Sequence, residues 1–545
     1  MTVDIASLVS DNLDIWTTAV ERKSGAGRGG GKRVNLYGVD RLRALILELA
    51  VQGKLVDQDP NDEPASDLLK RIKSEKARLV AAGKAKPGKP LSIPANWPFQ
   101  IPGNWAWSQL GQVTNYGQTE KADPGSVPPE MWVLELEDVE KGTSRLLERV
   151  RCSDRPFQSQ KNMFQAGDVV YGKLRPYLDK VIIADERGVC TTEMVPMRGY
   201  GEVRPDYIRL FLKTPFFISL ATESAHGMNL PRLATEKARE APFALPPLAE
   251  QQRIVAKVDE LIALCDALEA ESAAAMAAHQ ALVEALLATL TTSTNAADLA
   301  TNWARLDAHF DTLFTTDASV DALKRTILEL AVRGKLVESD NLSAWTEYKL
   351  GTVIGPMDSG WSPACHPFPA RTEEVWGVLK TTAVQNLEYQ PDQNKELPES
   401  LTPRPDAECR AGDILITRAG PTNRVGICCY VNATRPRLMI SDKIVRFRPA
   451  SEQIDGAFLA LILSVGPAAA QIEKAKSGMA ASQVNISQAK LREVVISLPA
   501  LAEQRQIVSK VNELSNICDA LNFQIADGAN TQMRLADAIV ERAAA

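Results

Sequence analysis

Patterns that mark catalytic and metal-binding proteins are scarce in this sequence of 545 residues. None of its four histidines, His226, His279, His309 and His366, stands at the spacing of a metal-ligand pair. A Gly-x-Ser-x-Gly nucleophile motif is absent. So is the Asn/Asp-Pro-Pro-aromatic loop expected for methylation of amino groups in DNA. These absences favour a protein that does not catalyse a reaction itself.

The eight cysteines include no Cys-x-x-Cys pair. Cys265 and Cys518 fall on apolar positions of helical patterns, which favours buried, reduced thiols. Cys428 and Cys429 are adjacent in a strand-like run, so their side chains point to opposite faces. They are poor partners in a metal site, and none is predicted.

Membrane and export signals are also lacking. No apolar run approaches the roughly 18 to 20 residues that span a bilayer. The start, Met1-Thr-Val-Asp-Ile-Ala-Ser, lacks the basic region and apolar stretch of a signal peptide. We expect a cytoplasmic protein with no membrane partner.

An overall basic excess is missing too, because the net charge is −6. This argues mildly against nucleic-acid binding, although acidic helices elsewhere can hide a local basic patch. The basic, glycine-rich stretch Lys23 to Arg33 is not a phosphate-binding loop, because Arg33 stands where Ser or Thr is required. It is expected to be a flexible linker, with incidental contact to the DNA backbone as the alternative.

Two proline-led stretches of the chain are nearly alike. They begin Leu245-Pro-Pro-Leu-Ala-Glu-Gln-Gln-Arg-Ile-Val and Leu498-Pro-Ala-Leu-Ala-Glu-Gln-Arg-Gln-Ile-Val. Proline and glutamate in the first turn indicate the start of a helix. The first helix, from about residue 248 to 290, would be roughly 60 Å long, so we expect it to pair with its repeat as a spacer.

Apolar residues follow each start with a seven-residue spacing, which indicates a coiled-coil seam. In the first helix the seam is expected at Ile254, Val258, Leu261 and Leu268, continuing through Leu282 and Leu286. In the second it is expected at Ile507, Val511, Leu514 and Leu521, continuing through Leu535 and Ile539.

A second motif also occurs twice, beginning at Leu42 and at Leu323, and contains Ile-Leu-Glu-Leu-Ala-Val-x-Gly-Lys-Leu-Val. About two-thirds of positions are identical over some eighteen residues, so the chain is a tandem duplication. The first half carries an insert, Pro60 to Pro102, that the second half lacks. It reads as an amphipathic helix, Asp67 to Ala82, followed by an extended linker.

Two variable regions contain short strand-like runs followed by a helix, which predicts mixed α/β domains. Gly167-Asp-Val-Val-Tyr and Gly412-Asp-Ile-Leu-Ile occupy corresponding places. We therefore expect one fold that carries two different surfaces.

With both motifs repeated around the second variable region, nearly the whole chain resembles the DNA-specificity subunit of type I restriction-modification systems. The resemblance implies α/β (α+β) target-recognition domains in a tandem pseudo-repeat, separated by long antiparallel coiled-coil helices. The expected parts are an N-terminal helical region with flexible linkers (1–102), recognition domain 1 (103–244), a central repeated region with the long spacer helix (245–342), recognition domain 2 (343–497) and the C-terminal repeated spacer helix (498–545).

The resemblance also implies how such a chain works. Each domain would read one half of a bipartite, asymmetric site in double-stranded DNA, and the helices would set the gap. The helices and shared motifs would dock two modification subunits, which use S-adenosylmethionine to methylate adenine. Restriction subunits that use ATP and Mg would add translocation and cleavage. This chain would bind no cofactor and catalyse nothing.

Two pairs of loops are the candidate DNA contacts. After a strand in each domain come Lys173, Arg175 and Tyr177, and then Arg418, Asn423 and Arg424, with Lys443 nearby. Before each long helix come Asn229 and Arg232, and then Ser482, Gln483 and Asn485. Between Arg404 and Arg448 basic residues outnumber acidic ones by about two to one. Solvated charged loops are the alternative for the first pair, and helix caps or ordinary turns for the second.

Two other functions remain open at this point. A scaffold could display both domains to protein ligands without a DNA role, and the modest net charge favours that slightly. A fused enzyme could contain an active site that the motifs do not reveal. Retention on DNA that falls steeply with salt separates the first from the DNA reader.

Overall fold

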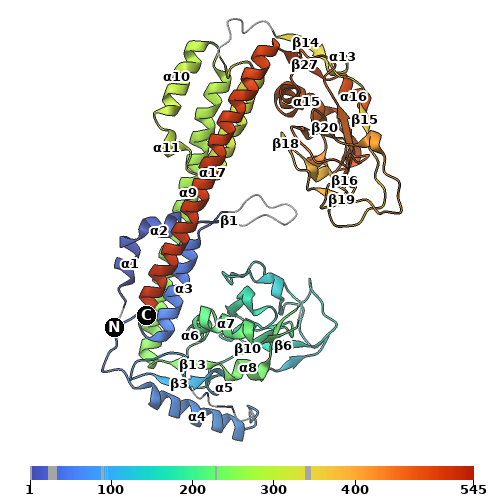
Figure 1. Ribbon diagram of the computed structural model, residues 1–545. Coiled ribbons are helices and arrows are strands. Elements are labelled where there is room, and N and C mark those ends of the chain that lie inside the picture. The colour runs from blue at the N-terminus through green and yellow to red at the C-terminus, as the bar shows by residue number, and fades with distance from the viewer. Residues whose placement is uncertain are drawn as a thin grey trace. The chain divides into compact units, whose positions relative to one another are not determined.

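The computed structural model describes residues 3–22, 34–87, 91–92, 94, 96–227, 230–337 and 345–544 (Figure 1). They form two compact units, residues 1–275 with 528–545 and residues 276–527. Helix α9 (Leu248–Thr292) begins in the first unit and ends in the second, and α17 (Leu501–Ala544) does the reverse. Each unit therefore contains one variable region and a part of both long helices.

The first unit begins with two short helices on either side of Asn12. The Asn12 side chain donates to Leu8 O over 2.9 Å and separates two short helices. Trp16 is fully buried behind them. The elements up to the insert are α1 (Ile5–Asp11), α2 (Leu13–Thr18), β1 (Glu21–Arg22), β2 (Val34–Asn35), α3 (Tyr37–Gln52) and α4 (Ala65–Ala81). The glycine-rich stretch at 23–33 lies outside the described residues.

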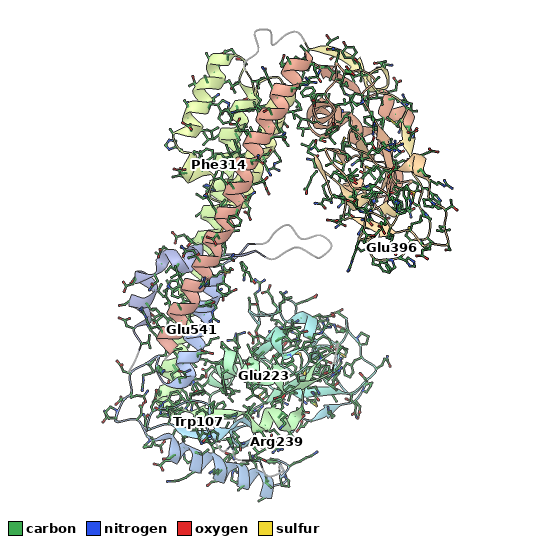
Figure 2. All side chains as sticks on the ribbon, in the orientation of Figure 1. Trp107, Glu223, Arg239, Phe314, Glu396 and Glu541 are labelled. Atoms are coloured by element: carbon green, nitrogen blue, oxygen red, sulfur yellow. The ribbon has the colours of Figure 1, made fainter. Side chains whose placement is uncertain are left out.

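The first variable region is closed by its own ends, because β3 (Ala106–Gln109) pairs antiparallel with β13 (Pro242–Leu245). Trp107 of β3, which is labelled in Figure 2, stacks on Trp97 of the insert. Their ring centroids are 4.9 Å apart. Inside lie sheets of order β4-β6-β9-β5 and β10-β7-β8. The remaining elements are α5 (Leu110–Val113), β4 (Lys121–Ala122), β5 (Trp132–Leu134), η1 (Leu136–Asp138), β6 (Lys161–Phe164), β7 (Val169–Gly172), η2 (Pro176–Leu178), β8 (Val181–Ile183), β9 (Gly188–Cys190), β10 (Met194–Met197), α6 (Pro205–Leu212), α7 (Pro215–Glu223), β11 (Ala225–His226), β12 (Arg232–Leu233) and α8 (Thr235–Glu240).

The second variable region is closed in the same way by β14 (Thr346–Lys349) and β27 (Val495–Leu498). Its sheets include β15-β24-β20-β22, β19-β16-β23 and β21-β26-β25. The other elements of this unit are α10 (Ala296–Asp307), α11 (Phe310–Leu313), α12 (Asp317–Val332), α13 (Leu350–Val353), β15 (Asp358–Ser359), β16 (Gly377–Leu379), η3 (Thr381–Ala383), β17 (Val384–Gln385), β18 (Glu388–Tyr389), β19 (Asn394–Glu396), η4 (Pro405–Ala407), β20 (Ile414–Thr417), β21 (Ala419–Gly420), η5 (Thr422–Arg424), β22 (Cys428–Tyr430), β23 (Leu438–Met439), β24 (Ile444–Phe447), α14 (Gly456–Ser464), α15 (Gly466–Ala475), β25 (Ser477–Ala480), β26 (Gln483–Asn485) and α16 (Gln488–Arg492).

The repeated Gly-Asp dipeptides have the same structural task in both regions. Asp168 accepts from Arg198 Nε over 2.7 Å, and Asp413 accepts from Arg448 Nε over 2.6 Å. Both carboxylates are buried and also accept a backbone N–H three residues upstream. Each ion pair fixes the turn that leads into the central strand, β7 or β20.

The helix of the repeated motif packs along both long helices in each unit. In the first unit Arg43 of α3 contacts Asp266 and Glu269 of α9, while Gln58, beyond the far end of α3, donates to Glu250. Because the far end of α3 meets the start of α9, these two helices are antiparallel. Tyr37 of α3 donates to Asp537 of α17, and Lys54 donates to Ala544 O at its end, so α3 and α17 run in the same direction. Within this unit α9 and α17 are therefore antiparallel.

The second unit repeats these contacts at equivalent residues. Lys324 of α12 contacts Asp519 as Arg43 contacts Asp266. Lys335 donates to Thr291 O and Ser293 O at the end of α9, over 2.9 and 2.7 Å, as Lys54 does at the end of α17. The indole N–H groups of Trp105 and Trp345 donate to Glu250 and Glu503, over 2.9 and 3.1 Å. The duplicated sequence thus specifies a duplicated set of long-range contacts.

Burial along the long helices departs from the seven-residue spacing after two repeats. Ile254, Val258, Leu261 and Cys265 are buried and Leu268 is half-buried, but the next buried positions are Val283, Leu287 and Leu290. Leu282 is 52% exposed. In α17, Ile507, Val511 and Cys518 are buried, Leu514 and Leu521 pack at the edge of the core, and Ala536 and Val540 are buried while Leu535 is 44% exposed.

The two helices follow an eleven-residue spacing instead. It runs through Ile507, Cys518, the half-buried Ala529 and Val540, and through Ile254, Cys265, Met276 and Leu287 in α9. Eleven residues make close to three turns of an α-helix, so the stripe stays near one face and drifts around the helix only slightly, in the sense of a right-handed supercoil. The alanine-rich middle of α9 hides this change, since small side chains mark no seam in the sequence.

The same alanine-rich part makes α9 apolar enough for a membrane span by length and by a mean hydropathy of 1.4. The expectation that no such stretch exists is corrected, because isolated polar residues interrupt the run without lowering its average enough. The bent pair α14 and α15, with 63° between them, passes the same test. Most of α14 lies in the core of the second unit, whereas α9 contributes Val283, Leu287 and Leu290 to that core and only 17% of its apolar window is buried.

The eleven-residue spacing predicts opposite outcomes for two neighbouring residues. Val283→Ala should lower the free energy of unfolding by about 2 kcal/mol, because it removes two buried methyl groups and leaves a cavity. Leu282→Ala should change it by less than about 0.5 kcal/mol. Chemical denaturation of the purified chain measures both, and a larger loss for Leu282→Ala would restore the seven-residue seam.

Lys335 is predicted to stabilise the end of α9. Lys335→Met should cost about 1 kcal/mol, because it leaves carbonyl groups at the helix terminus without their charged donor. Hydrogen exchange of residues 285–293 should accelerate. Lys395→Met, at an exposed lysine of β19, is the control and should leave this exchange unchanged. Equal exchange in both variants would contradict a capping role.

Candidate nucleic-acid interface

In the first unit, the loop after β7 lies against the hairpin formed by β11 and β12. Leu174 forms an antiparallel bridge with Arg232. The N–H of Arg175 donates to Pro231 O over 2.8 Å. The backbone therefore brings together the two loops that the sequence singled out in this domain. Lys173 is half-buried at their junction, and Arg232 is exposed.

The loop after β7 contains two residues in an unfavourable backbone conformation, and an ion pair anchors it to the domain. Arg175 and Asp179 have left-handed backbones, with φ of 53° and 49°, on either side of η2. This conformation costs roughly 1 to 2 kcal/mol per non-glycine residue. The Lys213 ammonium contacts the Asp179 carboxylate at 2.6 Å and fixes the position of that side chain. Burial raises the pKa of Asp179 and lowers that of Lys213, while each charge favours the ionised form of the other. Tyr177, 50% exposed, stands between the strained residues.

In the second unit, the loop after β20 is built into a three-stranded sheet. Its strand β21 pairs with β26, and β26 pairs with β25. Thr422 donates to Ala481 O through both its N–H and its hydroxyl, over 2.9 and 3.0 Å. Asn423, Ser482, Gln483 and Asn485 are exposed on this sheet and its turns. The two candidate loops again lie side by side.

The two loop pairs share one backbone frame. The N–H of Lys173 donates to Glu193 O over 2.9 Å, and the N–H of Arg418 donates to Lys443 O over 2.8 Å. Leu233 N–H donates to Lys173 O as Ile486 N–H donates to Arg418 O. Arg418 thus corresponds to Lys173, Lys443 to Glu193, and Asn485 to Arg232.

The side chains on this frame differ in charge. Arg232 Nε lies 3.0 Å from both carboxylate oxygens of Glu193, so the first domain presents an oriented guanidinium. The second domain has Lys443 and Asn485 at the equivalent positions, and Lys443 has no ion-pair partner among the described residues. Sequence reasoning missed Glu193, because only the pairing of β10 with β7 brings it to the frame.

The Arg424 side chain, which was expected to contact DNA, forms hydrogen bonds within the protein instead. Its guanidinium donates to Gln385 Oε1 over 3.0 Å and to the carbonyl oxygens of Thr381 and Val384 over 2.6 and 2.9 Å. Burial lowers its pKa. Arg424 therefore ties η5 to η3 and β17, and its hydrogen-bond donors face the protein.

Most of the basic excess between residues 404 and 448 is likewise internal. Arg435 donates to carbonyl oxygens of Val375 and Ala370, and Arg446 donates to those of Glu408 and Asp406. The guanidinium of Arg418 differs, because its Nε is buried and makes no hydrogen bond to the described residues. Arg418 and Lys443 are the cations of this segment that face the paired loops. Asn229, the remaining predicted contact, lies outside the described residues.

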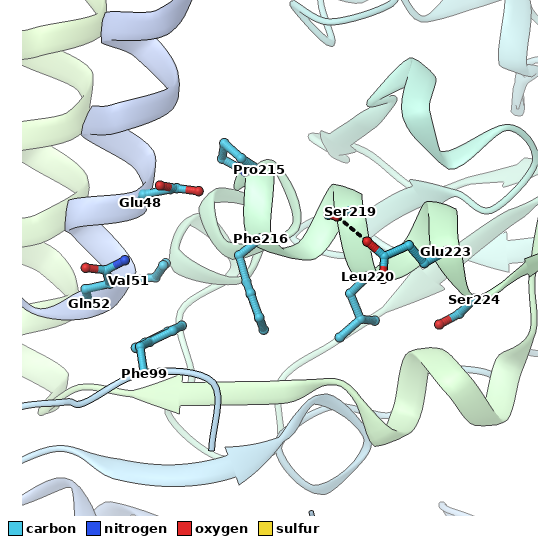
Figure 3. Close-up of a pocket in the computed structure, with 10 residues that line it drawn as sticks. All are labelled: Glu48, Val51, Gln52, Phe99, Pro215, Phe216, Ser219, Leu220, Glu223 and Ser224. Carbon is cyan, nitrogen blue, oxygen red and sulfur yellow. Dashed lines mark hydrogen bonds between the residues drawn. The ribbon is translucent and has the colours of Figure 1, made fainter. Parts of the chain in front are cut away.

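A cleft of about 560 Å³ in the first unit has another character (Figure 3). Its walls are Val51, Phe99, Phe216 and Leu220, with carboxylates at Glu48 and Glu223. Burial raises the pKa of Glu48. An apolar cleft with acidic groups repels phosphate, so this surface is not a candidate for the DNA backbone.

No group of three or more metal-ligating side chains is assembled in the part of the chain that the structure describes. All eight cysteines are free thiols. Burial raises the pKa of Cys409 and that of Cys429 to about 12, so these two are protonated and unreactive at neutral pH.

Comparison with known proteins agrees with this picture. The type I restriction modification DNA specificity domain matches residues 403–529. The EcoEI specificity subunit of Escherichia coli is 41% identical, with 99% of both chains covered. The EcoAI specificity subunit of the same organism is 31% identical over 99% of this chain and all of the other. A solved structure from a study of complex assembly in the type I R-M system has a TM-score of 0.53 at 21% identity, covering 82% of this chain and 99% of that one, which is a likeness of fold.

The matching DNA specificity domain and the two full-length relatives identify a DNA-recognition protein without catalysis of its own. The chain belongs to the family of type I restriction enzyme specificity subunits. The resemblance drawn from the repeated motifs, and the fold class with it, are thereby confirmed.

Lys443 and Arg424 should respond differently to truncation in the assembled DNA-binding complex. When the logarithm of the DNA association constant is plotted against the logarithm of the salt concentration, the line should be less steep for Lys443→Ala by about 1, because one phosphate contact is lost. Arg424→Ala should leave the slope unchanged and lower stability by about 1 to 3 kcal/mol through lost buried hydrogen bonds. Arg305→Ala, at an exposed arginine of α10, is the control for charge alone. If Arg424→Ala changed the salt dependence of DNA binding, Arg424 would have to be counted among the DNA contacts.

Proposed function

We propose that residues 103–244 and 343–497 each read one half of a bipartite DNA site through their paired loops. The observation that supports this most is the shared backbone frame with different side chains on it. A common frame suits two domains that approach DNA in the same manner. Different side chains suit two half-sites of unlike sequence.

The proposed contacts follow from the chemistry of each loop pair. Lys173, Arg175, Tyr177, Asn229 and Arg232 serve the first half-site, and Arg418, Lys443, Asn423, Ser482, Gln483 and Asn485 the second. An arginine oriented by a carboxylate suits guanine, whose O6 and N7 accept two hydrogen bonds. An asparagine suits adenine, whose N7 accepts and N6 donates.

The long helices would hold the two readers at a fixed separation, with their apolar seam as the joint. Their outer faces and the shared motifs would dock two modification subunits that transfer a methyl group from S-adenosylmethionine to adenine. Restriction subunits using ATP and Mg would join that complex. This chain would act in the cytoplasm, with no cofactor or membrane of its own.

The test is selection from a random DNA pool by this chain co-purified with its modification subunit. We expect a bipartite motif with a fixed gap. Arg232→Ala should relax bases in one half only and Asn485→Ala bases in the other, each by about 1 to 3 kcal/mol at the base concerned. A stable complex without sequence preference would favour the scaffold function. Changes in both halves from one substitution would contradict two independent readers.

A further inference from the structure

Helix α4, formed by the insert of the first half, covers one side of the first recognition domain. Its apolar face is buried at Ala65, Leu68 and Ile72. Lys76 donates to the carbonyl oxygen of Gly111 over 2.7 Å and lies 5.0 Å from the centre of the Tyr200 ring. This helix therefore seals the β3–α5 corner of the domain.

The edge of this contact is ionic. Arg71 of α4 lies 2.9 Å from the carboxylate of Glu202, on the turn that follows Tyr200. Apolar contacts in the centre and an ion pair at the rim make α4 resemble a peptide ligand that is covalently attached to its own binding site.

The second domain contains the same corner. Ala450 N–H donates to Val353 O over 2.9 Å as Tyr200 N–H donates to Val113 O over 2.8 Å. The packing of Arg492 against Gly351 repeats that of Arg239 against Gly111. These contacts make Gly351 equivalent to Gly111, Ala450 to Tyr200 and Glu452 to Glu202.

No described helix occupies this corner of the second domain. Only residues 333–345 separate α12 from β14 in the sequence, whereas α4 alone has 17 residues. An open groove of about 420 Å³ remains, lined by Tyr348, Thr352, Ile454 and Leu498 among others. Tyr348 is 41% exposed there. Its equivalent in the first domain, Ser108, is 1% exposed.

An acidic residue lies at the edge of the groove, at the position that corresponds to Glu202 in the first domain. Glu452 is exposed and has no ion-pair partner among the described residues, whereas its equivalent Glu202 contacts Arg71. The groove therefore presents Tyr348, Ile454 and Leu498 among threonine, serine and glutamine side chains, and the Glu452 carboxylate lies between the lining residues Ser451 and Gln453.

From this equivalence we infer that the groove of the second domain binds a basic amphipathic helix of a partner protein. Such a helix would place two apolar residues one turn apart on Tyr348 and Leu498. A basic residue beside them would pair with Glu452, and a second would reach the carbonyl oxygen of Gly351. The inference concerns a protein contact and does not depend on the DNA role proposed above.

The experiment uses the full chain and a fluorescent peptide of residues 62–84, which carries the α4 pattern in trans. We expect saturable binding by fluorescence anisotropy. Glu452→Arg should weaken it about fivefold, as expected for an exposed ion pair. A peptide with Arg71→Glu should recover binding to the Glu452→Arg chain. Thr352→Trp, which fills the groove, should abolish binding, and Glu399→Arg, an exposed carboxylate elsewhere in the unit, should have no effect.

Three outcomes overturn the inference. One is a failure of the peptide to bind. A second is binding that responds to Glu202→Arg but not to Glu452→Arg, because the peptide would then be displacing α4 in the first domain. The third is concentration-dependent self-association of the chain that Thr352→Trp removes, since a second copy would then be the occupant. Sedimentation of the chain without peptide tests this last case.

Discussion

The end of a helix leaves carbonyl groups without partners, and in this protein a lysine from the other half of the sequence satisfies them. Lys54 donates at the end of α17, and Lys335 donates at the end of α9. Each donor follows the glycine that ends its own repeated helix, where left-handed backbone turns the chain toward the neighbouring terminus. The start of each long helix is held by the indole of a tryptophan from the same half. Because each unit contains segments of both repeats, neither half can complete its helical core without the other.

The repeats made much of this arrangement predictable. Proline-led starts and a shared motif were enough to place two long helices and two variable domains, because these signals are local in sequence. The phase of the seam beyond Leu268 was not predictable, since alanine is compatible with either face of a helix. The placement of Leu282 and Leu535 depends on which side chains of α12 and α3 pack nearby, and this is tertiary information.

The candidate interface shows the same division. Loops rich in glycine and polar residues could be found from sequence, and the structure places them side by side in each domain. The excess of basic residues in the sequence did not show which individual arginines face a ligand. A guanidinium has five donors, and buried carbonyl groups at turns need partners, so most arginines between residues 404 and 448 are used inside the fold. Sequence does not distinguish such an arginine from one that faces a ligand.

This use of arginine bears on how the protein can bind DNA despite its negative net charge. Among the described residues, Arg418 and Lys443 are the cations that the second domain places at its paired loops, so the electrostatic attraction of these loops alone for phosphate is modest. A weak reader becomes selective when it is joined to a second one, because the second contact is intramolecular and its effective concentration is set by the connection between them. Binding to a wrong DNA sequence relies on phosphate contacts alone. It is therefore weak when the paired loops carry few cations. Under the proposed function, the internal arginines would favour specificity in two ways. Arg424 ties the loop after β20 to η3 and β17, and the other buried guanidinium groups withhold charge from non-specific contact.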